Sequence, residues 1–217
     1  MLTVLTGLTV RPVLTAPHGR PQRGVTLIEL AIGLAIFGIL LTLALPNFTA
    51  FLRNTEIKNA AETTLTGITL ARTEAVRRNA NVRFQLVSSL TAACALSTNT
   101  LNWVVSQDSA AGLCDVPPSD ITAPRIVQSK SSLEGTRNVV VATTGGSTIV
   151  FNALGRVSTA GITQIDLSNP AGGSCEHLVS GGAMRCLRVL ISTGGQIKLC
   201  DPQVPVVTPQ VDPRECQ

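Results

Sequence analysis

The longest feature of the hydrophobic pattern is an uncharged run from Leu30 to Leu52. As a helix, these 23 residues rise roughly 35 Å, enough to cross the hydrocarbon core of a bilayer. The apolar region of a secretory signal peptide has only about 7–15 residues, so a signal peptide fits poorly. We therefore predict a transmembrane helix over residues 25–52, although hydropathy alone does not show whether this anchor is processed.

After Arg53 the pattern becomes that of an amphipathic helix. Apolar residues recur at three- and four-residue steps, which places them on one helix face, and the charged residues lie mostly elsewhere. Asn79 suits the end of this helix, because asparagine tolerates the left-handed conformation at a helix C-terminus. We predict that residues 53–80 continue the first helix and carry a β domain. The apolar face consists of Ile57, Ala61, Leu65, Ile68, Ala71 and Ala75.

Residues 81–217 have the pattern of short strands separated by turns. Val82, Phe84 and Leu86 alternate with polar residues, and Gly-Gly pairs separate later β-rich runs. Thr193-Gly194-Gly195, between two apolar runs, is typical of a hairpin turn. The predicted fold class is α+β, with a long N-terminal helix packed on an antiparallel β-sheet head. Further strands are predicted at residues 103–105, 139–142, 148–151, 162–167, 187–191 and 196–199.

The positive net charge of +4 belongs mostly to the N-terminus. Residues 1–24 contain Arg11, Arg20 and Arg23 and no acidic residue, which makes a basic leader. Because basic residues beside a membrane span favour the cytoplasmic side, we expect the leader in the cytoplasm and the head in the periplasm. Residues 81–217 contain nine basic and nine acidic residues, so the head lacks the basic footprint of nucleic-acid binders.

An even number of cysteines, all beyond the apolar run, suggests disulfide bonds in an oxidising compartment. None forms a CxxC pair, and the only histidine beyond the leader is His177, so we expect no metal site. The sequence also has no nucleophile elbow and no phosphate-binding loop, so we predict neither an enzyme nor a cofactor. Six cysteines allow 15 pairings. They are Cys94, Cys114, Cys175, Cys186, Cys200 and Cys216.

The segment Arg23-Gly24-Val25-Thr26-Leu27-Ile28-Glu29-Leu30 closely resembles the cleavage site of type IV prepilins and type II secretion pseudopilins. The resemblance implies that a prepilin peptidase cuts after Gly24 and then N-methylates Val25, where the family most often has Phe. It also implies that the Glu29 carboxylate engages the amino terminus of a neighbouring subunit during assembly. Such a pairing neutralises both charges, so neither group is left as an unpaired charge in a low-dielectric environment.

Three later segments resemble the GspH/FimT branch of this family. They are Ala71–Asn79, Ile149–Val157, and Leu190–Pro202 together with Asp212–Cys216. This resemblance implies a minor pilin, in a tip or priming complex of a type IV pilus, with other pilins as partners and the inner membrane as its site before assembly. The equivalent pseudopilin of a type II secretion system shares the same sequence plan, and neighbouring genes would separate the two.

Some members of this branch are DNA receptors that carry a Gly-Arg-x-Arg pattern in the tail hairpin. Here the matching positions are Gly195, Gln196, Ile197 and Lys198, so one arginine is missing and the other is a lysine. Arg185, Arg188 and Lys198 could form a local patch, but a solvated strand face is the favoured interpretation. DNA is therefore a possible partner that we do not favour.

The tail suggests one disulfide pairing. The 15 residues between Cys200 and Cys216 include four prolines, so the tail would fray unless tied down. The resemblance implies the same disulfide-tied tail. The other four cysteines would then pair most simply as Cys94–Cys114 and Cys175–Cys186, although the sequence leaves their connectivity open.

Overall fold

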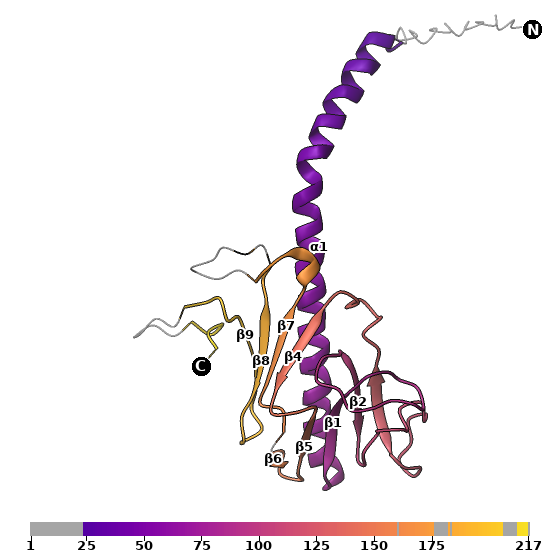
Figure 1. Cartoon of the computed structure of the whole chain (residues 1–217), viewed down its shortest axis with the longest axis vertical. Helices are drawn as coiled ribbons and strands as arrows, with labels where there is room; N and C mark the ends of the chain where they lie inside the picture. The colour runs from indigo at the N-terminus through magenta and orange to yellow at the C-terminus, as the bar shows by residue number, and fades with distance from the viewer. Residues whose placement is uncertain (1–23, 160, 176–181, 183, 206–211, 217) are drawn as a thin grey trace, which may run out of the picture. The chain divides into compact units, whose positions relative to one another are not determined.

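Figure 1 shows the computed structural model of the chain. It describes residues 24–159, 161–175, 182, 184–205 and 212–216, without the side chains of residues 43–47. The chain forms two compact units, Met1–Leu43 and Ala44–Gln217, and each is described here by itself. The leader, His177 and part of the tail lie outside the described residues.

The helix α1 extends from Leu27 to Arg78. The side-chain oxygen of Thr26 accepts a hydrogen bond from the backbone N–H of Glu29 at 3.3 Å and caps the helix start. At the other end, Asn79 has a φ of 49°, and the N–H groups of Asn79 and Ala80 donate to the carbonyls of Val76 and Ala75. These bonds form a Schellman motif, so the predicted end near Asn79 is confirmed.

The β domain contains two antiparallel sheets rather than one. The first sheet has the strand order β3-β2-β1-β5-β6, and the second has the order β4-β7-β8-β9. The β8–β9 hairpin is confirmed, with Ile191 paired to Ile197. Two strands, β3 and β6, were not predicted. The strands are β1 Val82–Val87, β2 Asn102–Ser106, β3 Ile126–Lys130, β4 Val140–Thr144, β5 Thr148–Phe151, β6 Val157–Thr159, β7 Gln164–Ser168, β8 Leu187–Ile191 and β9 Ile197–Cys200.

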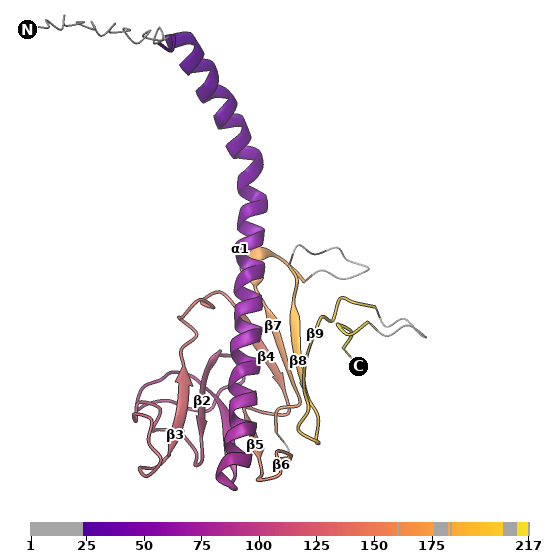
Figure 2. The same ribbon diagram turned by 180° about the vertical axis from the view of Figure 1, so that it is seen from behind.

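The main core lies between α1 and the strands, which Figures 1 and 2 show on one side of the helix. Small residues let the helix approach closely. A Cβ on Gly67 would lie 2.9 Å from Cε2 of Phe84, whose ring packs 5.8 Å from that of Trp103. Leu65, predicted on the buried face, is only half-buried, and Thr64 is fully buried beside it. The buried helix residues of this core are Ile57, Ala60, Ala61, Ile68, Ala71 and Ala75.

A second hydrophobic cluster packs against β1 and β2, separate from the main core. The Cys94–Cys114 disulfide lies within it, among Val87, Val104 and Ile126. Gln85 of β1 is also buried, and its side-chain oxygen accepts a hydrogen bond from the N–H of Ala110 at 2.9 Å. Residues on both faces of β1 are therefore buried, an arrangement that the sequence did not predict.

Candidate processing and assembly site

The predicted processing residues lie together at the start of α1. Gly24 and Val25 precede the helix and are exposed, and nothing lies within 4 Å of a Cβ built on Gly24. Glu29 is exposed in the first turn of the helix. A carboxylate in the first helical turn interacts favourably with the helix dipole. Within the described part of the chain, this carboxylate forms no ion pair.

Thr26 is a contributor to this site that the sequence reasoning missed. Its hydroxyl caps the helix at the turn that carries Glu29, so it fixes where the helix starts relative to the predicted cleavage position. The spacing Thr26-x-x-Glu29 matches a capping box, and this pattern could have identified it.

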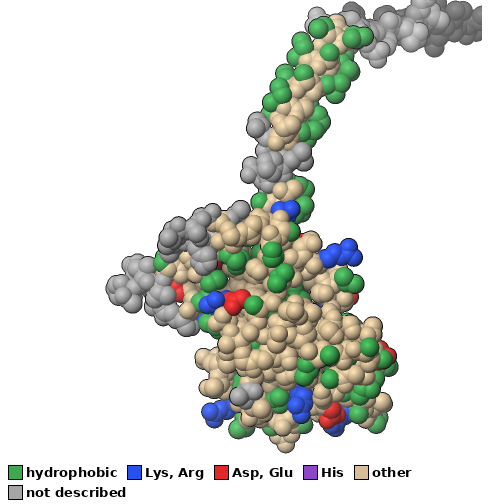
Figure 3. Space-filling view, viewed as in Figure 1, with side chains coloured by type: hydrophobic (Ala, Val, Ile, Leu, Met, Phe, Trp, Pro, Cys, Tyr) green, Lys and Arg blue, Asp and Glu red, His purple; other side chains and the backbone are tan. Residues whose placement is uncertain are grey.

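The first part of α1 exposes large apolar side chains, which Figure 3 shows in green. They include Leu27, Ile32, Phe37 and Leu40, all more than half exposed. Among the described residues, no helix combines the length and the hydropathy needed to cross a membrane. The transmembrane helix over residues 25–52 therefore stays a prediction.

Polar contacts attach the middle of α1 to three loops of the head. The Glu56 carboxylate accepts hydrogen bonds from the side-chain amides of Asn138, at 3.2 Å, and of the buried Asn169, at 2.8 Å. Two residues earlier, the side-chain oxygen of Asn54 accepts the backbone N–H of Arg185 at 2.9 Å. These contacts hold the helix against the loops before β4, after β7 and before β8.

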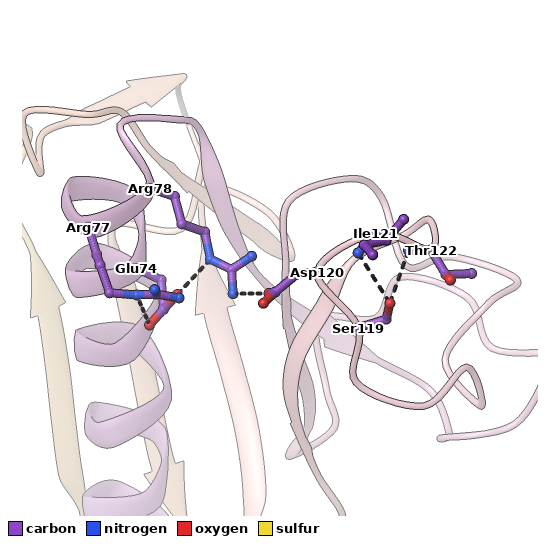
Figure 4. Close-up of polar contacts among 7 residues, drawn as sticks. All are labelled: Glu74, Arg77, Arg78, Ser119, Asp120, Ile121 and Thr122. Atoms are coloured by element: carbon purple, nitrogen blue, oxygen red, sulfur yellow. Dashed lines mark hydrogen bonds and ion pairs between the residues drawn. The ribbon is translucent and has the colours of Figure 1, made fainter.

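An ion-pair network fixes the end of α1 (Figure 4). Glu74 accepts hydrogen bonds from Arg77 at 2.7 Å and from Arg78 at 2.6 Å, and Arg78 also pairs with Asp120 at 2.6 Å. The hydrogen bonds from Arg77 and Arg78 lower the pKa of Glu74 below its usual value. The same contact with Glu74 raises the pKa of Arg78. The network joins the helix to the loop at Ser119, whose hydroxyl accepts the N–H groups of Ile121 and Thr122.

Three disulfides stabilise the head in this structure. Cys94 bonds to Cys114, Cys175 to Cys186, and Cys200 to Cys216. The pairing is the one that the sequence analysis favoured. Cys200 ends β9, and the N–H of Asp201 donates to the carbonyl of Arg214 at 2.8 Å, so the end of the tail returns to the edge of the sheet.

The three residues considered for DNA contact do not form one patch. Arg188 and Lys198 share the outer face of the second sheet, since Lys198 lies opposite Leu190, two residues from Arg188. Arg185 instead lines a groove with Leu187 and Leu199 on the helix side of that sheet. Both arginines have a carboxylate partner, Arg188 in Asp166 at 2.6 Å and Arg185 in Asp201 at 3.3 Å. In the described ranges, no group of three or more His, Cys, Asp or Glu could hold a metal ion.

The sequence of this chain matches the profiles of two known families or motifs. The profile of the family described as "Type II transport protein GspH" matches residues 60–201, more than half of the chain. The chain belongs to the GspH family. A second profile, the "Prokaryotic N-terminal methylation motif", matches residues 19–45 of this GspH-family protein.

Individual proteins match this chain either over a short segment or at low sequence identity. "Pilin-like protein PilA1" of Thermus thermophilus is 45% identical over 65 residues, which cover 30% of this chain and 40% of that protein. The chain thus spans less than half the length of this curated relative. Two crystal structures of the type IV minor pilin FimU of Pseudomonas aeruginosa are 14% and 17% identical, with TM-scores of 0.41 and 0.42. They cover 67% and 70% of this chain and 97% of each FimU chain.

The GspH-family protein is thus a pilin-like subunit with an α+β fold, a structural protein rather than an enzyme. Its N-terminal methylation motif, at residues 19–45, includes Gly24, Val25 and Glu29, the residues that the sequence analysis selected for processing and assembly.

Proposed function

We propose that this protein is a minor pilin or pseudopilin, cut between Gly24 and Val25, that assembles through its N-terminal helix into a type IV pilus or a related filament. The observation that carries the proposal is the methylation motif placed on a helix whose apolar side chains are exposed. Before assembly, residues 25–52 anchor the chain in the inner membrane with the head in the periplasm. The three disulfides support an oxidising location for the head.

We also propose a position for the subunit in the filament. It lies in a tip or priming complex, where few copies are needed. Immunogold labelling of intact filaments tests this placement, because a tip subunit gives single terminal spots and a shaft subunit gives labelling along the length. Assembled copies on a pilus are extracellular.

The second candidate is the H-type pseudopilin of a type II secretion system. The printed family description, a type II transport protein, favours it. Deletion of the gene separates the two, because a pseudopilin mutant loses protein secretion and a pilus subunit mutant loses pili. A DNA receptor is less favoured, because Gln196 replaces an arginine of that pattern and because Arg185 and Arg188 lie on different faces of the second sheet.

Glu29→Ala tests assembly directly. We expect normal amounts of processed protein in the membrane but at least a tenfold loss from the sheared filament fraction. Leaving one member of a desolvated ion pair alone costs about 3–5 kcal/mol, which is more than enough for that loss. The matched control is Glu62→Ala, which removes an exposed carboxylate from the same helix. Wild-type incorporation of Glu29→Ala, measured by quantitative immunoblotting, would contradict the proposal.

A further inference from the structure

A groove of about 460 Å³ lies between α1 and the β8–β9 hairpin. This volume falls in the range of about 300–1,000 Å³ that is usual for ligand sites. Its apolar wall consists of Phe51 from the helix and of Leu187, Leu199 and Cys200 from the sheet. Phe51 is exposed, and Leu187 and Leu199 are only half-buried, although Val189 on the same strand is fully buried. The core therefore covers the sheet at Val189 but leaves Leu187 and Leu199 partly exposed in the groove.

The charged lining of the groove consists of three cationic side chains, Lys58, Arg185 and Arg214, and of two carboxylates, Glu62 and Asp201. Each cation has a carboxylate partner, respectively Glu62 at 3.7 Å, Asp201 at 3.3 Å and Asp212 at 2.7 Å. The cations are the more exposed members of the pairs. The side chains of Arg185 and Arg214 are 58% and 61% exposed, against 6% for Asp201 and 32% for Asp212. The cationic ends therefore lie closer to solvent than their partners, and each keeps N–H groups that its carboxylate does not use.

The position of the groove along the chain indicates what enters it. Phe51 and Leu52 are the last residues of the uncharged run that begins at Leu30. If residues 25–52 span the bilayer, the groove begins at the level of the lipid headgroups. An apolar wall next to projecting cations at that level is complementary to a lipid acyl chain joined to an anionic headgroup.

We propose that this groove binds an anionic phospholipid, with an acyl chain against Phe51, Leu187 and Leu199 and with the phosphate facing Lys58, Arg185 and Arg214. The inference rests on the membrane anchorage in the proposed function. It assigns the head a contact with the membrane surface that is separate from the assembly contact of Glu29. Arg214 already donates from Nε and Nη2 to Asp212, so its remaining N–H groups are the ones that would reach a phosphate.

The test uses the full chain in vesicles of phosphatidylcholine, with or without phosphatidylglycerol, in which one lipid carries a photoactivatable acyl chain. Flotation comes first and reports membrane anchorage alone. After illumination, mass spectrometry maps the labelled peptides. We expect labelling within residues 51–62 and 185–201, and more labelling from phosphatidylglycerol than from phosphatidylcholine. Since each cation near a charged lipid surface contributes about 1 kcal/mol, each one lost should reduce the phosphatidylglycerol labelling about fivefold.

Matched variants separate the groove from the rest of the surface. Lys58→Gln and Arg214→Gln should reduce the labelling, whereas Arg185→Lys, which keeps the charge beside the buried Asp201, should keep most of it. Lys198→Gln is the control for charge, because Lys198 lies on the opposite face of β9. Leu199→Gln should abolish the labelling, and Leu190→Gln on the outer face is its control. Peptide mapping of the three disulfides shows which variants are correctly folded.

The outcomes distinguish a failure of the membrane anchor from a failure of the lipid site. A chain that does not float refutes both the anchor and the lipid site. A chain that floats but is labelled equally by both lipids, or is labelled equally in Lys58→Gln and Lys198→Gln, refutes the lipid site and leaves the assembly proposal standing. Cross-links from the groove to the N-terminal helix of a second subunit would likewise replace the lipid with a protein partner.

Discussion

At the end of α1, the Glu74 carboxylate holds Arg77 and Arg78, and Arg78 extends the contact to Asp120 in a distant loop. The side chains of Glu74 and Arg78 are only 12% and 13% exposed, so the bond between these two is shielded from water. We expect Glu74→Gln to lower the free energy of unfolding by about 1–2 kcal/mol at neutral pH, because hydrogen bonds between charged groups are lost. Thermal unfolding of the full chain measures this. Glu62→Gln, which breaks an exposed pair, should change stability by less than about 0.5 kcal/mol.

Glu74 should also make the stability of the folded chain depend on pH. The pKa of Glu74 is lowered in the folded chain, so its stabilising contribution is fully present above the usual pKa of a glutamate. That contribution is lost as the pH falls through the lowered pKa of the folded state. Glu74→Gln should therefore flatten the fall in stability with acidification. Parallel acid-unfolding curves for the wild type and this variant would show that the network does not contribute.

Residue-scale features were predictable where their cause is local. The end of the helix at Asn79 follows from one backbone preference, and the spacing from Glu74 to Arg78 is itself a helical pair. The contact with Asp120 was not predictable, because it joins positions far apart in the sequence. The same holds for Gly67, whose lack of a Cβ matters only because Phe84 and Trp103 lie against it.

At the scale of elements, strands with alternating or apolar patterns were predicted and irregular ones were missed. β1, β5 and β8 lie at or near their expected bounds. β3 contains Gln128, Ser129 and Lys130 at the edge of its sheet, so it carries little hydrophobic signal. The alternating pattern of β1 predicted Gln85 on the polar, solvent-facing side of the strand. In the structure, the segment between β1 and β3 covers this side, and Gln85 is buried. Alternation cannot reveal a strand that is covered on both faces.

The disulfide-tied tail yields a prediction at this scale. Replacing both Cys200 and Cys216 with Ser should lower the free energy of unfolding by roughly 3 kcal/mol, because the bond closes a loop of sequence separation 16. The double variant avoids leaving one reactive thiol, and denaturant unfolding measures the change. Non-reducing peptide mapping of the wild type is the companion experiment. A peptide that joins Cys200 to any cysteine other than Cys216 would overturn the pairing.

For the whole molecule, charge predicts weak binding of nucleic acid. The basic and acidic residues of 81–217 cancel, and Arg185 and Arg188 pair with carboxylates. The purified full chain should bind duplex DNA weakly at low salt and lose that binding between about 50 and 200 mM salt, as expected for a few phosphate contacts. Fluorescence anisotropy over a salt series checks this. Tight binding that persists at physiological salt would favour the DNA receptor instead.

The family and its methylation motif were predictable from the sequence because the motif is a short, contiguous segment. Residues 19–45 carry that motif in one stretch, and no folding is needed to assemble it. The groove beside β8 and β9 was not predictable, because its walls come from α1, the hairpin and the tail.

We propose that the chain is cut after Gly24 and enters filaments as a processed subunit. Mass spectrometry of its N-terminal peptide, recovered from sheared filaments, tests this processing. We expect a chain that begins with N-methylated Val25. A chain in that fraction that still carries Gly24, or one found only in the membrane and never in filaments, would contradict it.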